Sequence, residues 1–293
     1  MLNVLEGFDL AALGYGTVDG IHLLAEAMKI AFADRNAATG DPAFVDVPVA
    51  RLVAKEYAAA RRGDIDMGKA SAYAAGVAAE HGGPMTQDPQ PPAGSPHTTH
   101  VTVADADGNV VAATQTINNL FGSKAMVPGT GMLLNNTMAL FDPHPGHTLS
   151  VAPGKRMTSS MAPTIVLRDG RPAAALGLPG GVRILTSMLQ AIVNLIDHGM
   201  SLQEAVEAPR VWTQGQDLEV ELAVPDAVRA GLAARGHRVV AVPHVAGGMG
   251  AIAFERDGAL TGASCWRADG TPVGIGGGYA RQGIRFWPDA RRR

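Results

Sequence analysis

The chain has 293 residues, with 24 Lys and Arg against 27 Asp and Glu, so its formal net charge is −3. Hydrophobic residues make up 46% of it and charged residues 17%, a globular composition that excludes a disordered chain. The near-neutral charge excludes a general attraction to nucleic acid or to an anionic membrane surface, and no run approaches the about 18 apolar residues of a membrane span. Length therefore predicts one large domain or two ordinary ones.

The N-terminal residues indicate whether a signal peptide for export is present in this sequence. It reads MLNVLEGFDL and lacks the basic start and long apolar run of a signal peptide. As it stands, the chain is expected in the cytoplasm. A periplasmic or secreted location remains open if a further segment precedes Met1.

Helical patterns dominate the first 62 residues. Apolar residues recur every three or four positions from Thr17 to Arg35, which predicts an amphipathic helix with Asp19 in its first turn. A second helix is predicted over Val49–Arg62, where alanine is frequent and Gly63 can end it. The following segment, 64–97, is rich in Gly and Pro and includes QDPQPPAGSP, so we expect an exposed, flexible connector there.

The remainder alternates strands and helices. Three pairs of strand-like segments flank turns at Asp107-Gly108, Asp169-Gly170 and Asp257-Gly258, and predict three hairpins of antiparallel sheet. The segment VRILTSMLQAIVNLIDHG is apolar on most of its surface, which is typical of a helix sandwiched in a core. Further helices are predicted after the capping box of Ser201 and Glu204 and over Pro225–Ala234. The pattern indicates an α+β fold.

The junction between the connector and the first hairpin carries the most informative residues, His97-Thr98-Thr99-His100. Threonine is a common strand residue, so one interpretation is purely structural. The other starts from cleavage of the His97–Thr98 bond. Thr98 would then be a new N-terminus, with its hydroxyl as nucleophile and its own α-amino group as base. Before cleavage the same hydroxyl can attack the preceding carbonyl, which would make the maturation autocatalytic.

A glycine-rich segment, Gly177–Gly181, fits the same chemistry. It follows a predicted strand and opens the buried helix, so its backbone N–H groups can bind negative charge at a helix N-terminus. Acyl transfer needs such donors for the oxyanion, each contributing about 3–4 kcal/mol. The alternatives are an ordinary strand-to-helix turn or a phosphate cradle, although the latter would require Gly-Lys-Ser/Thr where this chain has Gly-Val-Arg.

Two other features have competing interpretations. Ser159 and Ser160 follow the basic pair Lys155-Arg156 and can bind a carboxylate, or simply form a turn rich in Ser and Thr. Cys265, the one cysteine, is interpreted as a packed thiol. No spacing of histidines and carboxylates indicates a metal site, so we expect neither a metal nor a cofactor.

Five blocks together resemble the γ-glutamyltranspeptidase (glutathione hydrolase) family of N-terminal-nucleophile hydrolases. They are DGIHLLAEAMKIAFADRN with GDPAFVDVP, TTHVTVADADGNVVAATQTIN, GTGMLLNNTM, PGKRMTSSMAPTIVLRDG and LGLPGGVRILTSMLQ. The resemblance implies a four-layer αββα sandwich from which the first half of the usual chain is absent. It also implies that residues 1–97 are the end of the large subunit and residues 98–293 the small, catalytic subunit.

The resemblance assigns roles to residues at matching positions. Thr98 would be the self-processing residue and the nucleophile, with cleavage between His97 and Thr98. Thr116 would support the nucleophile's amine, and Gly180 and Gly181 would form the oxyanion hole. An acyl ester on Thr98 would then be attacked by water or by an amine acceptor.

The implied substrate site holds both matches and departures. Asn118 matches an asparagine that touches the donor's amino group, and Ser159 and Ser160 match the pair that holds its α-carboxylate. Thr137 and Leu140, however, stand where the family usually has glutamine and an ammonium-binding aspartate. Losing that acid should cost about 2–5 kcal/mol of γ-glutamyl recognition.

Three hypotheses therefore stay open. The first is a γ-glutamyltransferase or glutathione hydrolase acting on a small-molecule amide. The second is an amidohydrolase of the same family acting on an amide that is not γ-glutamyl. The third is a non-catalytic half that serves only as a partner subunit or is a remnant. The absent first half itself has three explanations: the chain is one piece of a two-chain enzyme with a separate N-terminal-half chain, it has a late-called start of a longer gene, or it is a degenerate half.

Overall fold

The computed structural model describes residues 1–77 and 97–275 of the chain. Five helices come first, and the longest of them organises the others. They are α1 (Leu2–Leu5), α2 (Leu10–Leu13), α3 (Val18–Ala38), α4 (Val49–Leu52) and α5 (Lys55–Arg62). The Thr17 hydroxyl caps α3 by accepting from the Gly20 N–H at 3.0 Å, at the predicted start of that helix. The single helix predicted over Val49–Arg62 is interrupted at Val53 and Ala54.

Residues 64–77 do not form the exposed segment that the sequence predicts. They lie along α3, whose buried polar side chains take partners from them. Lys29 donates to the Ser71 carbonyl at 3.1 Å, and the Gly76 N–H donates to Asp34 at 2.7 Å. Buried polar groups need such partners, and composition alone does not reveal them. The proline-rich run QDPQPPAGSP lies outside the described residues.

The three predicted hairpins are confirmed, and they build two sheets. β1 (Thr98–Ala104) pairs with β2 (Val110–Thr116) as a separate two-stranded sheet. A second, antiparallel sheet has the order β3-β4-β8-β9, with β3 (Thr164–Arg168), β4 (Arg171–Gly177), β8 (Gly250–Phe254) and β9 (Leu260–Ser264). A third sheet holds β5 (Val211–Trp212), β6 (Asp217–Glu221) and β7 (Arg238–Val242), with β6 and β7 parallel.

The helix α6 (Arg183–Ile196) joins two hydrophobic cores. Ile184, Met188 and Ala191 belong to the core under the four-stranded sheet, together with residues of α7 (Leu202–Glu207). Leu189 and Val193 belong to the other core, which contains α3, the third sheet and α8 (Asp226–Ala234). The prediction of a helix sandwiched in the core is therefore confirmed, as is the capping box at the start of α7.

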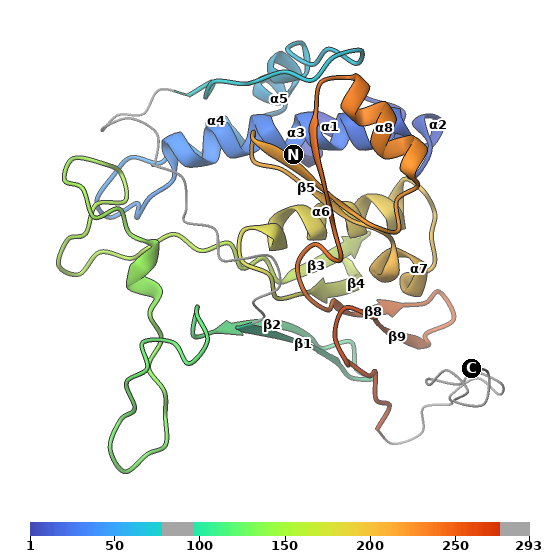
Figure 1. The fold of residues 1–293 in the computed structure, drawn as a ribbon. Helices are drawn as coiled ribbons and strands as arrows, with labels where there is room; N and C mark the ends of the chain where they lie inside the picture. The colour runs from blue at the N-terminus through green and yellow to red at the C-terminus, as the bar shows by residue number, and fades with distance from the viewer. Residues whose placement is uncertain (78–96, 276–293) are drawn as a thin grey trace.

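The elements stack in layers (Figure 1). The β1–β2 hairpin lies against one face of the four-stranded sheet, and α6 and α7 cover the other face. Two contacts fix the hairpin: the His100 ring occupies the space beside Gly177, and the Thr102 hydroxyl donates to the Gly250 carbonyl at 3.3 Å. Among the described residues, no helix has the length and apolar character needed to cross a membrane.

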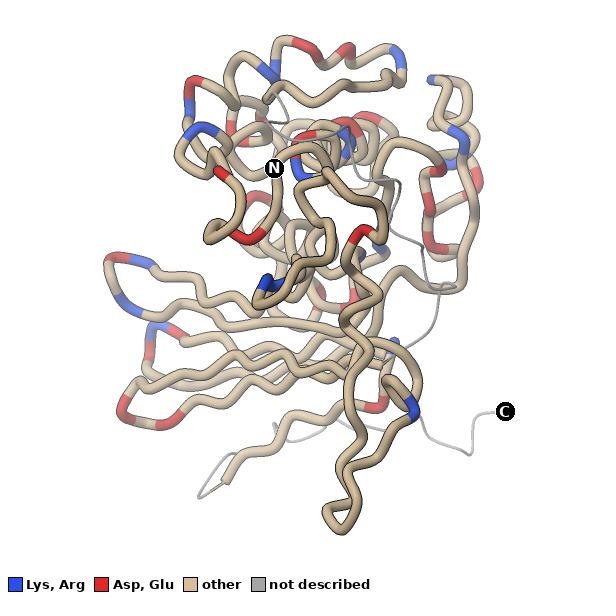
Figure 2. The backbone as a smooth tube through the Cα atoms, turned by 90° about the vertical axis from the view of Figure 1, so that its left-hand side faces the viewer, with Lys and Arg blue, Asp and Glu red and all other residues tan. Residues whose placement is uncertain are grey.

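The outer face of the hairpin is apolar and open. Val101, Val103 and Val111 point away from the four-stranded sheet and are between 53% and 57% exposed. The loop over residues 117–136 follows β2, projects from the body (Figures 1 and 2), and exposes further apolar side chains, among them Leu120, Phe121 and Met126. Lys124 is its one charged residue. Contiguous apolar surface of this kind is typical of a face that another polypeptide covers.

Candidate active site

Hairpin register brings two threonines together at the open end of β1 and β2. Thr98 and Thr116 are directly paired across the strands. The Thr98 hydroxyl donates to the Thr116 hydroxyl at 2.9 Å, and the Thr116 hydroxyl donates to the His97 carbonyl at 3.2 Å. Thr116 thus contacts both the hydroxyl and the peptide carbonyl of the predicted cleavage site.

Asn118, two residues after Thr116, joins the hydrogen bonds around the Thr116 hydroxyl. Its backbone N–H donates to the Thr116 hydroxyl at 2.9 Å, which fixes the direction in which that hydroxyl can donate. Its own φ of 72° is one that asparagine tolerates better than most residues. The Asn118 side chain donates to the Asn136 side chain at 3.2 Å. The candidate site is thereby joined to the short helix η1 (Thr137–Leu140).

The two departures from the family pattern lie on η1. The Thr137 backbone N–H donates to Asn135 at 3.0 Å, and its hydroxyl donates to the same oxygen at 2.5 Å. The Leu140 side chain is half-buried. Neither residue supplies a carboxylate, so this part of the site presents a hydroxyl and an apolar side chain.

The hairpin also leads from Thr98 to the glycine segment. His100, two residues after Thr98, packs on Gly177, where any side chain would collide with its ring. The ring contacts the hydroxyls of Thr114 and Thr102 at 2.8 and 2.9 Å, and burial lowers the pKa of His100. A neutral histidine side chain therefore packs between β1 and the end of β4.

Gly180 and Gly181 form the turn between β4 and α6. Their φ angles are +145° and +60°, a region that favours glycine. A Cβ on Gly180 would lie 2.4 Å from the Ala246 Cβ, so the position also has no room for a side chain. Within the described residues, neither glycine's backbone N–H donates a hydrogen bond. Both donors are therefore free at the N-terminus of α6.

Ser159 and Ser160 lie on the extended segment before β3. Ser159 is exposed and its hydroxyl accepts from the Met161 N–H at 3.2 Å. Neither serine hydrogen-bonds to Thr98, Thr116 or Asn118 within the part of the chain that the structure describes. The structure thus brings Thr98, Thr116 and Asn118 into direct contact, and places the serines on a separate segment.

The serine segment is fixed to the loop that follows α3. Arg156 donates to the buried Asp41 carboxylate through its guanidinium at 2.8 and 3.2 Å and through its backbone N–H at 2.8 Å. These hydrogen bonds from Arg156 hold the pKa of Asp41 well below its usual range. Asp41 belongs to the GDP block of the part predicted to be large subunit, so this ion pair links the two predicted subunits.

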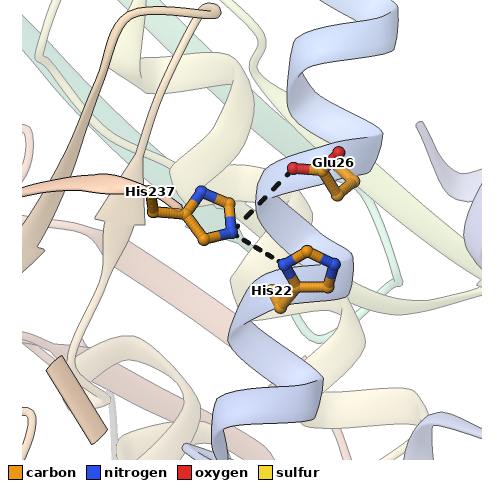
Figure 3. Close-up of side chains that lie close together, drawn as sticks. All are labelled: His22, Glu26 and His237. Carbon is orange, nitrogen blue, oxygen red and sulfur yellow. Dashed lines mark hydrogen bonds and ion pairs between the residues drawn. The ribbon is translucent and has the colours of Figure 1, made fainter. Parts of the chain in front are cut away.

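A buried cluster that the sequence did not reveal lies on the opposite side of the molecule, between α3 and the start of β7. His22, Glu26 and His237 lie together there (Figure 3). His22 Nδ1 is 2.7 Å from His237 Nε2, and His22 Nε2 is 2.8 Å from the Asp66 carbonyl. The available signal was the one-turn spacing of His22 and Glu26, but His237 is 215 residues further along the chain.

The cluster fits a hydrogen-bonded pair better than a metal centre. Because the Asp66 carbonyl must receive the His22 Nε2 proton, His22 Nδ1 is left to accept from His237. Both Glu26 oxygens are already engaged: Lys29 donates to one at 2.7 Å, and Tyr73 and the Ser71 N–H donate to the other. An ion bound by all three residues would have to displace Lys29 from Glu26. We therefore assign the cluster to folding.

Stability should depend on pH through His237. Burial and then the Lys29 ammonium lower the pKa of His237 to about 4, whereas an unfolded histidine titrates near about 6.5. The unfolded chain therefore binds the proton first, and stability that is complete above pH 6.5 falls by about 3 kcal/mol as the pH is lowered to 4, at about 1.4 kcal/mol for each pH unit. Urea unfolding at a series of pH values measures this.

The matched variant is His237→Gln, which keeps a donor for His22 but does not titrate in this range. It should be less stable than the wild type at pH 7.5 and lose less stability between pH 6.5 and 4. His244→Gln, at a partly exposed histidine outside the cluster, is the control and should leave the pH profile unchanged. A wild-type profile that His237→Gln does not flatten contradicts the assignment.

Comparisons with known proteins agree with the resemblance in the sequence. The profile of the family described as Gamma-glutamyltranspeptidase matches residues 1–275. The chain is 64% identical over 286 residues to the Acylase ACY 1 proenzyme of Pseudomonas sp. (strain SE83), covering 98% of this chain and 49% of that protein. It is 39% identical over 277 residues to the Glutathione hydrolase proenzyme of Escherichia coli (strain K12), covering 90% of this chain and 46% of that protein.

Solved structures show the same likeness. The crystal structure of a cephalosporin acylase from Bacillus halodurans superposes with a TM-score of 0.80 at 29% identity, covering 94% of this chain and 48% of that one. The α+β fold class expected from the sequence is thereby confirmed. The chain spans about half the length of the curated relatives that it matches. It belongs to the γ-glutamyltranspeptidase family.

Proposed function

We propose that the chain is the catalytic part of an N-terminal-threonine acylase that cleaves itself between His97 and Thr98. The observation that carries this proposal is the relay from the Thr98 hydroxyl through Thr116 to the His97 carbonyl. A purely structural pair of strand threonines has no need to contact the preceding peptide carbonyl. The relatives' designation as proenzymes supports a maturation step.

The relay suits the first step of self-cleavage. Thr116 accepts the proton of the Thr98 hydroxyl while its own proton polarises the His97 carbonyl. The Thr98 oxygen then attacks the His97 carbonyl carbon, the proton that left the Thr98 hydroxyl passes to the Thr98 nitrogen as the C–N bond breaks, and an ester and a free α-amine replace the amide. Water hydrolyses this ester, which releases a carboxylate on His97 and restores the Thr98 hydroxyl beside a free α-amine.

Turnover uses the same oxygen. The α-amine of Thr98 takes the hydroxyl proton, the oxygen attacks the substrate's amide carbon, and the leaving amine takes the proton. The free N–H groups of Gly180 and Gly181 are the donors that we assign to the tetrahedral oxyanion. Water or an amine acceptor then attacks the acyl ester on Thr98 and completes the cycle.

Self-cleavage provides the first test. Denaturing gels and intact-mass spectrometry should show fragments 1–97 and 98–293. Thr98→Ala should abolish them, because no nucleophile remains. Thr116→Val keeps the shape but removes the relay, and should slow cleavage about 100-fold, the lower range for a general acid–base group.

Thr99→Ala is the matched control, since the Thr99 side chain points to the exposed face of the same strand. It should cleave at the wild-type rate. A wild-type chain that stays intact, or a Thr98→Ala variant that is cut at the same bond, contradicts the proposal.

The acyl group that we assign carries a carboxylate but no ammonium. Thr137 and Leu140 offer an ammonium no counter-charge, and burying an unpaired ammonium is costly. The relative at 64% identity is named an acylase and not a glutathione hydrolase, which favours an amide other than a γ-glutamyl amide. A γ-glutamyl amide that lacks its ammonium is a glutaryl amide, which we therefore take as the probe. The second candidate function is γ-glutamyl transfer, favoured by the glutathione hydrolase relatives.

Leu140→Asp tests the specificity. It should raise kcat/KM for a γ-glutamyl anilide relative to the glutaryl anilide by about 30-fold or more, the lower limit for a buried charge pair. Leu140→Asn is the control of equal size without the charge and should leave the ratio within about threefold of the wild type. A wild type that already prefers the γ-glutamyl anilide would overturn the assignment and favour the second candidate.

We further propose that a separate or preceding N-terminal half covers the open face of the β1–β2 hairpin. The apolar valines of that face and the nearly uncharged loop over residues 117–136 support this, together with the half-length match to the relatives. Burying three valines would contribute several kcal/mol at about 1.5–3 kcal/mol each.

Co-expression tests this assembly. The part of the Pseudomonas acylase that precedes the matched region should co-purify with this chain in a one-to-one complex and raise glutaryl-anilide turnover at least about tenfold over the chain alone. The double variant Val101→Lys with Val103→Lys should abolish co-purification. Lys124→Ala, on the same surface, is the control. Full turnover by the chain alone, unchanged by its partner, would contradict the proposal.

A further inference from the structure

A cluster of four buried side chains lies next to residues 245–249, which pack against the glycine segment. It plays no part in the reaction described above. Arg210 precedes β5, Glu221 ends β6, and Cys265 and Arg267 follow β9. The side chains of Glu221 and Arg267 are 1% and 0% exposed, and the residues Arg210 and Cys265 are 2% exposed each. Charged groups are almost never this buried without partners.

The charges of this cluster do not balance unless Cys265 is ionised. Arg267 forms an ion pair with Glu221, with Nε 2.6 Å from one carboxylate oxygen. The Arg210 guanidinium instead donates to three backbone carbonyls and to the Cys265 sulfur, at 3.6 Å. The cluster thus holds two guanidinium groups and one carboxylate, and that carboxylate is paired with Arg267. Among the described residues, the remaining group that can carry a negative charge and contacts Arg210 directly is the Cys265 thiol.

The surroundings of the Cys265 sulfur suit an anion. The Met249 N–H donates to it at 3.1 Å, in addition to the Arg210 contact. Burial by itself raises the pKa of the thiol, but Arg210 and the N–H groups of Met249 and Arg267 outweigh burial, and the net pKa lies below the ordinary value. Tyr15 is a further titratable group that interacts with Glu221 and Arg267. Burial and Glu221 raise its pKa to about 12, so it stays neutral.

The cluster holds one short segment, residues 245–249. Arg210 donates to the carbonyls of Val245 and Gly247 at 3.3 and 2.9 Å. Glu221 accepts from the Val245 N–H at 2.7 Å, and Cys265 accepts from the Met249 N–H. Both ends and the middle of the segment are therefore fixed by buried charges.

Residues 245–249 also pack against the segment that carries the candidate oxyanion donors, Gly180 and Gly181. The Gly247 N–H donates to the Pro179 carbonyl at 2.9 Å. A Cβ on Gly247 would lie 2.7 Å from the Pro179 ring, and one on Gly180 would collide with Ala246. Because the packing leaves no free space at Gly247 or at Gly180, a shift of residues 245–249 would also move Gly180 and Gly181.

We propose that Cys265 is a thiolate that completes a charge-balanced cluster with Arg210, Glu221 and Arg267, and that this cluster positions the Gly180-Gly181 oxyanion donors through residues 245–249. Its four members are positioning residues, because none of them touches the reacting atoms. The functional part of this inference rests on the proposed function; the ionisation of Cys265 does not.

The ionisation is tested by ultraviolet difference spectroscopy. Because the chain has one cysteine, the spectrum of the wild type minus that of Cys265→Ser reports on this thiol alone. The folded protein at pH 7 should show the thiolate absorption band, which should disappear in urea at the same pH, where an ordinary thiol is protonated. A folded protein without the band overturns the proposal.

A second pair of variants tests the positioning. Cys265→Asp keeps a negative charge and an acceptor for the Met249 N–H, whereas Cys265→Ser keeps the acceptor alone. In the assembled protein, Cys265→Asp should keep kcat for the glutaryl anilide within about threefold. Cys265→Ser should lose about tenfold or more in kcat with KM unchanged, because the lost stabilisation is confined to the transition state.

The two proposals fail in different ways. If the wild type neither cleaves itself nor turns over substrate, the proposed function fails. The ionisation of Cys265 is then still tested by the thiolate band and by thermal stability, which should decrease in the order wild type, Cys265→Asp, Cys265→Ser. If the wild type is active but Cys265→Ser matches Cys265→Asp in kcat and stability, the cluster proposal fails and the proposed function stands.

Discussion

The paired register of β1 and β2 is the constraint on which the candidate site depends. It places Thr98 opposite Thr116 and so creates the 2.9 Å contact between their hydroxyls. A slip of one residue would send the Thr98 side chain to the other face of the hairpin, away from Thr116 and from the four-stranded sheet. His100 and Thr102 resist that slip, because both point to the same face and contact the sheet at Gly177 and Gly250.

The other half of the site, the Gly180-Gly181 turn, is fixed by the packing of the elements around it. α6 carries the glycine turn at its N-terminus and is fixed by two cores, so the turn sits on one of the most constrained helices of the chain. Buried charges fix residues 245–249, which pack against that turn. Acyl transfer benefits from this rigidity, since oxyanion donors that need no reorganisation are worth more than mobile ones. The open outer face of the hairpin contrasts with this tightly packed interior.

The sequence predicted the local elements well where one pattern dominated. The hairpin turns carry Asp-Gly pairs, the starts of α3 and α7 carry side-chain caps, and α6 is apolar on most sides, so neighbouring residues alone determine these features. The resemblance assigned Thr116 a role beside the nucleophile, and the hairpin register of the structure pairs it with Thr98. Thr98 as cleavage site, the site roles and the division of the chain at Thr98 stay predictions; of the predicted site residues, the structure brings Thr98, Thr116 and Asn118 into contact.

What the sequence could not predict depends on contacts between distant residues. Residues 64–77 look like a connector by composition, and only the buried polar groups of α3 explain their place. His237 lies 215 residues from His22, and no local pattern joins them. Cys265 looked like an ordinary packed thiol because Arg210, Glu221 and Arg267 surround it only in the folded chain. In each case the missing information was which charge or donor would be buried beside which partner.

The central claim is that the Thr98 oxygen carries the acyl group, and trapping that intermediate tests it most directly. The assembled protein is mixed with a glutaryl anilide, quenched in acid during turnover, and digested for peptide mapping by mass spectrometry. The account predicts a glutaryl ester on the peptide that begins with Thr98, and none in a Thr98→Ala variant. An acyl group on another residue, or turnover that proceeds with Thr98 never acylated, would contradict it.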